Sequence, residues 1–438
     1  MALQLYVVGG AVRDELLGRP PTDRDWVAVG TTPDELIALG YKPVGRDFPV
    51  FLHPLTREEV ALARTERKTA PGYHGFVFHA APDVTLEQDL ARRDLTINAM
   101  ARDERGTLID PFGGARDLRD KVLRHVSEAF AEDPVRLLRV ARFAARLPDF
   151  TLAPATRALL RRMVEAGEVD ALVPERVWQE LSRGLMEARP SRLLDVLRDS
   201  GALARLLPEV DRLFGVPQRP EHHPEVDTGE HLRLVLDIGA RLQAPLPVRF
   251  AALLHDVGKG STPAQHWPRH HGHEAAGARL AVAIAERLRA GNECRDLAEL
   301  AAREHGNVHR SASLDATALM RLLERCDALR RPERFEQLLL ACECDMRGRL
   351  GHAERPYPER PRLSSALRAA LAVDSAGVAA RAAAQGLAGP QIGQRVRMAR
   401  IAAIAAHDPV TPAAGPAADG APSAATGGGD ATPPTRPS

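Results

Sequence analysis

The sequence predicts an α+β multidomain protein in which an α/β head precedes a long all-helical part. Strand-like segments are concentrated in about the first 110–130 residues, where they alternate with short helical patterns. From Glu132 onward, apolar residues recur at the spacing of amphipathic helices. We therefore expect a head at 1–125, helical units at 126–220 and 221–331, more helices at 332–407 and a disordered tail at 408–438.

The head is expected to contain five strands and two short helices. The strands are 3–8, 25–29, 48–52, 60–65 and 108–109, and the helices are 11–17 and 33–39. Three prolines between residues 216 and 224 predict a joint between the helical units. The last thirty residues contain seven prolines and five glycines. Such a segment cannot bury enough apolar surface to offset its ordering entropy, so we expect disorder there.

Charge and cysteine usage exclude several classes of protein. The formal net charge of +1 excludes a histone-like polycation and an acidic tail, although one local basic face would still suffice for a nucleic acid. The four cysteines form no CxxC pair, which excludes a zinc ribbon and a disulfide framework. No signal-peptide pattern and no run of about 18 apolar residues is present. We therefore expect a cytoplasmic protein with no membrane partner.

A glycine turn and a pair of carboxylates suggest phosphate chemistry in the head. Gly9 and Gly10 end a strand-like run and would let a backbone approach a phosphate, with Arg13 one helical turn later as a clamp. By itself this turn is more often purely structural. Asp23 and Asp25 alternate in an extended segment and so share a face, where their repulsion calls for a hard cation such as magnesium. A solvated acidic turn is the alternative for this pair.

Further candidates follow at residues 92–100 and 132–146. Arg93 supplies a second guanidinium for a triphosphate, and Asp94 is a candidate for sugar hydroxyls or, alternatively, a helix cap. Asp133 precedes Pro134 and is therefore also a candidate helix cap. Four arginines share one face of the following helix, and a solvated basic face is the alternative interpretation. They are Arg136, Arg139, Arg142 and Arg146.

An aspartate acceptor beside an arginine donor matches particular nucleobases. Cytosine and adenine each present an amino donor next to a ring acceptor, whereas uracil and guanine present the reverse order. Asp133 with Arg136 would therefore accept C and A and refuse U and G, by about 1–3 kcal/mol for a bidentate match. This arrangement leaves Arg139 and Arg142 for phosphate. Side chains would then take the place of a nucleic acid template.

The ordered motifs GGAVRD, DRDW, LARTERK, RRDLTINAM, IDPFGG and EDPVRLLRVARFAAR resemble those of class II CCA-adding tRNA nucleotidyltransferases. The resemblance implies a polymerase-β-like nucleotidyltransferase head and an activity that adds CCA to tRNA from CTP and ATP, releasing pyrophosphate. It implies magnesium on Asp23 and Asp25 and base reading by Asp133 and Arg136. Nucleotide or phosphate contacts are implied at Gly10, Arg13, Arg93, Arg139 and Arg142.

The resemblance extends to a C-terminal HD domain. His231, the pair His255 and Asp256, and a later aspartate taken as Asp345 reproduce the H…HD…D order of HD metallophosphohydrolases. Lys259 is a phosphate candidate or, equally, a surface lysine, and His273 and His305 are candidates for the surrounding shell. The related family implies phosphatase, 2′-nucleotidase and 2′,3′-cyclic phosphodiesterase activities with nickel.

Two other functions remain open from the sequence. A bacterial poly(A) polymerase shares the head motifs, although the HD pattern favours the CCA-adding interpretation. Alternatively, the head is an RNA-binding module and the HD unit is the sole enzyme. The sequence does not indicate which way the side chain of Glu66 points, so no role is assigned to this residue. The sequence does not decide between a monomer and a homodimer.

Overall fold

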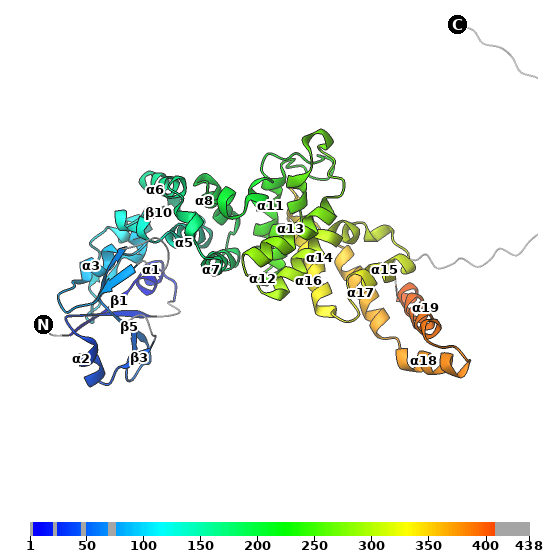
Figure 1. Cartoon of the computed structure of the whole chain (residues 1–438), viewed down its shortest axis with the longest axis horizontal. Coiled ribbons are helices and arrows are strands. Elements are labelled where there is room, and N and C mark those ends of the chain that lie inside the picture. Colours follow the sequence, from blue (N-terminus) through cyan, green and yellow to red (C-terminus); the bar gives the residue numbers. More distant parts are fainter. Residues whose placement is uncertain (1–2, 21–23, 45–49, 69–75, 408–438) are drawn as a thin grey trace, which may run out of the picture.

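A computed structural model describes residues 3–20, 24–44, 50–68 and 76–407. Figure 1 shows an elongated molecule with the head at one end, helical layers in the middle and the last helices at the other end. The predicted fold class is confirmed: an α/β head is followed only by helical units and one very small sheet. Asp23 and the expected tail at 408–438 lie outside the described residues.

The head is built on a sheet whose described strands are ordered β3-β4-β5-β2-β1-β8-β9. Strands β1 and β2 pair antiparallel, whereas β2 and β5 pair parallel. The strands are β1 (Gln4–Val8), β2 (Asp25–Val29), β3 (Lys42–Val44), β4 (Val50–Leu52), β5 (Glu59–Leu62), β8 (Ala101–Arg102) and β9 (Leu108–Ile109). Strands β6 (Thr65–Lys68) and β7 (Phe76–His79) form a separate hairpin.

Alternation along β2 determines which helix covers each face of the sheet. Val27 packs with Leu86 and Leu90 of α3 (Leu86–Ala91). Ala28 faces the other way, toward a cluster that includes Leu36 of α2 (Pro33–Ala38). This is the period of two expected for a strand buried on both faces. The side of the sheet near α1 (Gly10–Leu16) then continues into the helical part.

The strand expected at 60–65 is wrong in one respect, because it divides into β5 and β6. The Arg64 backbone N–H donates to Asp89 Oδ1 at 3.3 Å and so leaves the ladder. An acidic side chain twenty-five residues away thus ends the strand, and periodicity along the chain does not reveal it.

The helical part begins with α5, which packs on the head, on α7 and on α8. Short strands β10 (Val122–Leu123) and β11 (Thr151–Leu152) pair beside it. The helices of the body are α5 (Val135–Arg146), α6 (Pro154–Glu165), α7 (Pro174–Leu185), α8 (Ser191–Asp199), α9 (Ala202–Leu206) and α10 (Pro208–Asp211), whereas α4 (Gly114–Arg119) lies in the head, where it contacts α1.

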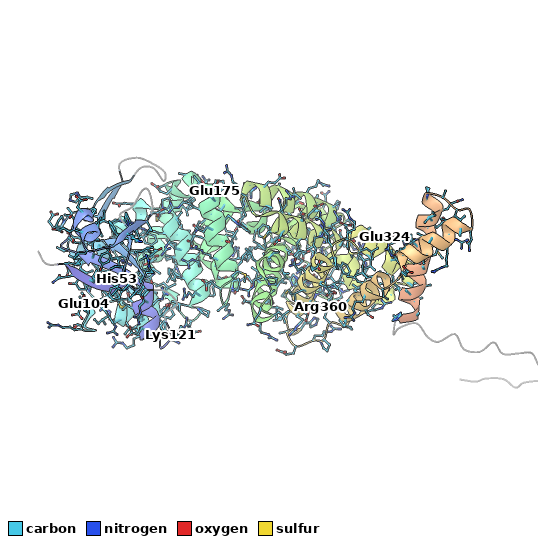
Figure 2. All side chains as sticks on the ribbon, turned by 90° about the horizontal axis from the view of Figure 1, so that it is seen from below. His53, Glu104, Lys121, Glu175, Glu324 and Arg360 are labelled. Atoms are coloured by element: carbon cyan, nitrogen blue, oxygen red, sulfur yellow. The ribbon has the colours of Figure 1, made fainter. Side chains whose placement is uncertain are left out.

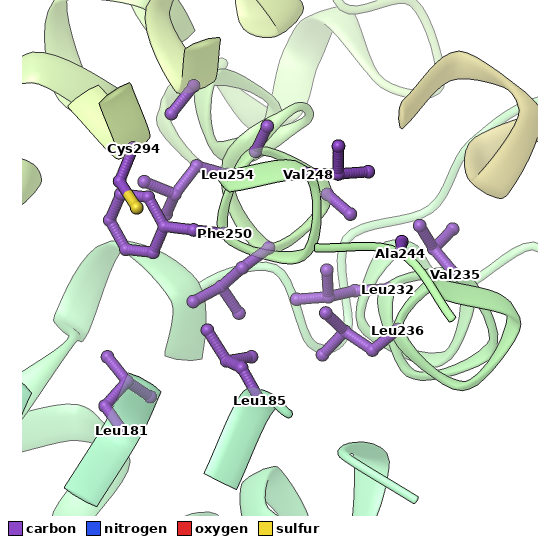
Figure 3. Packing of buried hydrophobic residues seen from close by; sticks show 14 of the residues in the cluster. Leu181, Leu185, Leu232, Val235, Leu236, Ala244, Val248, Phe250, Leu254 and Cys294 are labelled. Carbon is purple, nitrogen blue, oxygen red and sulfur yellow. The ribbon is translucent and has the colours of Figure 1, made fainter. Parts of the chain in front are cut away.

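The next helices share their hydrophobic core with the body. Figure 3 shows Leu181 and Leu185 of α7 packed near Phe250 of α12, with Leu236 of α11 beside them. The buried Arg249 donates from Nη1 to Leu185 O at 2.8 Å, which ties α12 to the end of α7. These helices are α11 (Thr228–Arg241), α12 (Leu246–Leu254), α13 (His273–Arg287), α14 (Asn292–His309), α15 (Ala316–Arg325) and α16 (Pro332–Arg347).

Three final helices complete the described chain: α17 (Glu359–Leu371), α18 (Ser375–Ala384) and α19 (Pro390–His407). Arg360 pairs with Glu343 of α16 at 2.6 Å, and Arg397 of α19 donates to Glu324 of α15 at 2.7 Å. Figure 2 shows Arg360 and Glu324 at this end of the molecule. Across the described ranges, no one helix has the length and apolar character needed to cross a bilayer; α17 and α18 meet that test only together, with a 46° bend between them.

Candidate active sites

The glycine turn of the head lies directly against Arg93. Gly9 adopts φ +72°, a left-handed conformation that favours glycine, and its N–H donates to Met100 O at 3.1 Å. A Cβ added to Gly9 would lie only 2.8 Å from Arg93 Nη1. Asp89 holds that guanidinium, because Arg93 Nη2 donates to Asp89 Oδ2 at 3.2 Å. The turn and the second predicted phosphate ligand therefore share one small surface.

Asp25 lies beside this turn. It is the first residue of β2 and faces Val8, the last residue of β1, in the antiparallel register. Since Gly9 follows Val8 directly, the exposed Asp25 and the turn lie at the same end of the strand pair. The sheet thus brings together Gly9 and Asp25, which are sixteen positions apart in the sequence. A carboxylate with hard oxygen donors at this place suits a magnesium ion.

Arg13 is buried behind the turn instead of projecting from it. Its guanidinium donates to Asp14 through Nε and Nη2, both at 2.9 Å, and to Asn98 Oδ1 at 2.6 Å. Arg146 of α5 also pairs with Asp14, at 3.0 Å. The guanidinium of Arg13, the expected phosphate clamp, is therefore hydrogen-bonded to other side chains of the protein in this structure. Its Nη2 lies 3.6 Å from the place that a Cβ added to Gly10 would occupy.

Asp94 connects the head to α5. The side chain is buried, and its oxygens accept from Leu95 N at 2.8 Å, Asn98 Nδ2 at 2.9 Å and Arg139 Nε at 2.7 Å. Burial raises the pKa of Asp94, but Arg139 and these hydrogen bonds outweigh it and lower the pKa from 3.8 to about 2. The helix-cap alternative is wrong, because the N-cap of the short 3₁₀ helix Thr96–Asn98 is Leu95, and Asp94 instead accepts a hydrogen bond from Arg139.

We expect Asp94→Asn to lower the free energy of unfolding by about 2 kcal/mol at pH 7. Because the folded-state pKa is depressed, this stabilisation is present above pH 3.8 and disappears as the pH falls toward 2. The difference between wild type and variant in urea unfolding should therefore shrink across that window. Asp120→Asn, at an exposed aspartate of the head, is the control and should produce no such difference. A difference that does not change with pH would contradict the assignment.

The arginines of α5 contact protein groups. Arg142 Nε donates to Glu180 of α7 at 2.6 Å and Arg139 Nε donates to Asp94 at 2.7 Å, while the phosphate contacts expected of both arginines stay predictions. Arg136 and Arg142 are buried, so a solvated basic face is wrong. The physical reason is that a buried guanidinium requires a compensating acceptor. Through these contacts, the arginines of α5 instead hold the helix between the head and α7.

Asp133 is held by α7. Arg176 donates from Nη1 and Nη2 to the two Asp133 oxygens, at 3.1 and 3.0 Å, and the Val135 N–H donates to Asp133 Oδ1 at 3.2 Å. Arg136 Nη1 donates to Ala129 O at 2.8 Å. The sequence did not single out Arg176. The only sequence signal for Arg176 is that it lies one helical turn before Glu180 on α7. Glu180 in turn contacts Arg142 of α5.

The second site gathers all four residues of the predicted HD pattern. His231 of α11 lies 3.1 Å from Asp345 Oδ1 through Nε2, and His255 Nε2 lies 3.3 Å from Asp256 Oδ2 and 3.9 Å from Asp345 Oδ2. These four residues are buried. Of the four, Asp256 and Asp345 line a cavity of about 660 Å³, whose wall also includes Lys259. Among the four residues, Asp345 was the one that the sequence constrained least. Its carboxylate lies close to both His231 and His255.

The donor set fits a divalent cation. His255 Nε2 and Asp256 Oδ1 are buried and have no hydrogen-bond partner among the described residues. Burial lowers the pKa of His255, but the carboxylates of Asp256 and Asp345 outweigh this and raise it to about 9. Mixed nitrogen and oxygen donors suit divalent transition metals.

Several neighbours of this cluster were not predicted. Glu225 Oε1 lies 2.9 Å from His231 Nδ1, an arrangement that orients the opposite ring nitrogen toward Asp345. His309 Nε2 lies 2.6 Å from Asp345 Oδ2. The spacing of four between His305 and His309 on α14 was the available signal. Lys259 is buried and donates to Asp256 Oδ2 at 2.6 Å, so the surface-lysine alternative is wrong.

Comparisons with known proteins show which family this chain belongs to. Models of a "Poly A polymerase head domain", a "Probable RNA and SrmB- binding site of polymerase A" and an "HD domain" match residues 5–124, 149–214 and 228–334. The chain is 68% identical over 403 residues to the multifunctional CCA protein of Leptothrix cholodnii, covering 92% of this chain and 96% of that protein. The chain belongs to the multifunctional CCA protein family. It is a CCA-adding tRNA nucleotidyltransferase, as its resemblance to the class II enzymes implied.

Other members of the family agree with this assignment. The multifunctional CCA protein of Paracidovorax citrulli is 68% identical over 402 residues, which cover 91% of this chain and 96% of that protein. The crystal structure of the Bacillus stearothermophilus CCA-adding enzyme in complex with CTP is 25% identical, with a TM-score of 0.61 over 92% of this chain and 89% of that one. The alternatives of a poly(A) polymerase and of a hydrolase with a noncatalytic head are therefore not adopted. The HD domain indicates a metal-dependent phosphohydrolase.

Proposed function

We propose that this enzyme builds or repairs the 3′-terminal CCA of tRNA from CTP and ATP, with side chains of α5 choosing the base. The observation that carries the proposal is the meeting of α5 with the glycine turn. Arg146 pairs with Asp14 of α1, and Arg139 pairs with Asp94, close to Arg93 and Asp25 in the head. The CTP complex of the Bacillus stearothermophilus enzyme supports the nucleotide class.

In this proposal the tRNA 3′-hydroxyl attacks the α-phosphorus of the nucleotide and pyrophosphate leaves. Asp23 and Asp25 would hold magnesium, which reduces the cost of the charge that develops on the attacking and leaving oxygens. Gly10 of the turn and Arg93 bind the triphosphate. Arg13, Arg139 and Arg142 supply positive charge around it. A carboxylate has about four lone-pair sites, so Asp133 retains acceptor capacity for a base while Arg176 fixes it.

We expect Asp133→Ala to relax base selection. Discrimination of CTP against UTP should fall by about 10- to 100-fold in kcat/KM, the equivalent of about 1–3 kcal/mol for one bidentate match. Arg176→Ala should reduce the same ratio by a smaller factor, because Asp133 loses its orienting partner but keeps its oxygens. Glu175→Ala, at the exposed neighbouring position, is the matched control. An unchanged CTP/UTP ratio in Asp133→Ala would exclude a side-chain template.

The HD unit is proposed to hydrolyse phosphoesters, namely phosphomonoesters, 2′-nucleotides and 2′,3′-cyclic phosphates. His231, His255, Asp256 and Asp345 would hold a divalent cation, proposed to be nickel, which would polarise water and the phosphate. Lys259, buried beside Asp256 on the cavity wall, is positioned to neutralise the phosphate. The four cysteines are unpaired and buried, which supports action in a reducing cytoplasm. We propose a monomer or a homodimer.

A further inference from the structure

Lysine and arginine side chains of the described chain line the cavity of the HD unit. Lys259 is already paired, because its Nζ donates to Asp256 Oδ2 at 2.6 Å. Three arginines of the wall are exposed to solvent. They are Arg219, Arg269 and Arg310. A further arginine, Arg349, is only partly exposed, so water screens its charge less than the charges of the other three.

The guanidinium of Arg349 has no acceptor in the described part of the chain. Its Nε is buried without a hydrogen-bond partner, and no ion pair joins it to an acidic side chain among these residues. Arg347, two residues earlier, differs, because it pairs with Glu343 at 3.0 Å and its Nε donates to Ala353 O at 2.9 Å. Withdrawing a charged donor from water without an acceptor costs free energy. Arg349 therefore keeps hydrogen-bond donors available for a negatively charged ligand.

The backbone on both sides of Arg349 is fixed by contacts with distant parts of the HD unit. A Cβ added to Gly348 would lie 2.7 Å from Val235 Cα, so only glycine lets this segment pack so closely on α11. On the other side, the Leu350 N–H donates to Glu225 Oε2 at 3.0 Å. Arg349 is therefore held at the cavity by tertiary contacts of its own backbone segment.

We propose that Arg349 binds the phosphate group of the substrate of the HD unit. A guanidinium stays charged and its planar fork matches two oxygens of one phosphate, so the expected contact is bidentate. Asp345, four residues earlier in the chain, lines the same cavity, which brings a predicted metal ligand and this donor to one site. The substrate phosphate would then be held by Arg349 as well as by the cation and Lys259. This inference rests on the proposed hydrolase function.

The alternative is that Arg349 only offsets the negative charge of the buried Asp256 and Asp345. In that case Arg349 would matter for the fold or for metal binding, and phosphate would bind equally well without it. A metal ion held by these carboxylates would offset the same charge and leave the arginine without a counterion. Binding of phosphate and binding of metal therefore have to be measured separately.

The test measures hydrolysis of adenosine 2′,3′-cyclic phosphate by the full chain with Ni²⁺, and its competitive inhibition by inorganic phosphate. Arg349→Gln should lower kcat/KM and raise the inhibition constant of phosphate, each by about 10- to 100-fold, as expected for charge-assisted hydrogen bonds. Arg349→Lys keeps the charge but loses the fork, so its values should lie between those of the wild type and Arg349→Gln. It also remains informative if the glutamine variant does not fold. Arg279→Gln, at an exposed position of α13 outside the cavity wall, should match the wild type.

Equilibrium dialysis with Ni²⁺ separates a role in phosphate binding from a role in metal binding, because Arg349→Gln should bind as much Ni²⁺ as the wild type. Unchanged phosphate inhibition in Arg349→Gln, or a loss that added Ni²⁺ restores, would overturn the assignment and leave the hydrolase proposal intact. A wild-type chain that hydrolyses no phosphoester would overturn the hydrolase proposal. Calorimetric binding of inorganic phosphate that Arg349→Gln abolishes would then still support the anion site, whereas equal binding by both chains would overturn it too.

Discussion

Asp25→Asn should reduce CCA addition on the order of 10³-fold or more. The substitution keeps the size of the side chain but removes one negative charge at the end of β2, beside Gly9. Magnesium stabilisation of the transferred phosphoryl group is worth several kcal/mol, and each 1.36 kcal/mol corresponds to a factor of ten. The loss should appear in kcat for both CTP and ATP. The measurement is single-nucleotide extension of a tRNA that ends at the discriminator base.

Asp34→Asn provides the matched control, because Asp34 is an exposed aspartate of α2 on the same domain. Phosphoester hydrolysis by the HD unit should be unchanged in Asp25→Asn. Full CCA addition by this variant would show that the carboxylate next to the turn is not a catalytic ligand.

His255→Ala should reduce hydrolysis of a 2′,3′-cyclic phosphate on the order of 10³-fold while CCA addition stays near the wild-type rate. His255 lies at the end of α12, its Nδ1 is fixed by Ala252 O at 2.8 Å, and its Nε2 faces both carboxylates. Its removal deletes a ligand for which the alanine offers no replacement, so the cation that polarises the phosphate is bound weakly. The measurement compares both reactions in one preparation, with Ni²⁺ added for the hydrolysis.

His271→Gln, on the cavity wall but outside the ligand groups, should keep both activities. Loss of CCA addition together with hydrolysis in His255→Ala, at an unchanged melting temperature, would contradict the division into two sites.

Local sequence patterns were sufficient for the fold class and for finding the residues that the structure gathers in the HD cluster. The strand-like run 25–29 and the helical spacing in 135–146 correspond to β2 and α5. The HD pattern likewise brought His231, His255 and Asp345 together, since each residue type and its helix were visible in the sequence. Their roles as ligands and base readers stay predictions.

What local patterns did not reveal is the pairing between distant elements. Arg13 donates to Asn98, eighty-five residues away, and Arg142 pairs with Glu180, thirty-eight residues away. The division of the strand at Arg64 depends on Asp89, and the orientation of Asp133 depends on Arg176. Each of these contacts is set by tertiary packing and the need to neutralise buried charge, and no periodicity in one segment encodes it.

Helix α7 gives the enzyme a mechanical connection between its two chemistries. Its first turns carry Arg176 and Glu180, which hold Asp133 and Arg142. Its last turn packs through Leu185 against the helix that ends just before His255. A change in the tilt of α7 would therefore move both Asp133, the proposed base reader, and the helix that precedes His255.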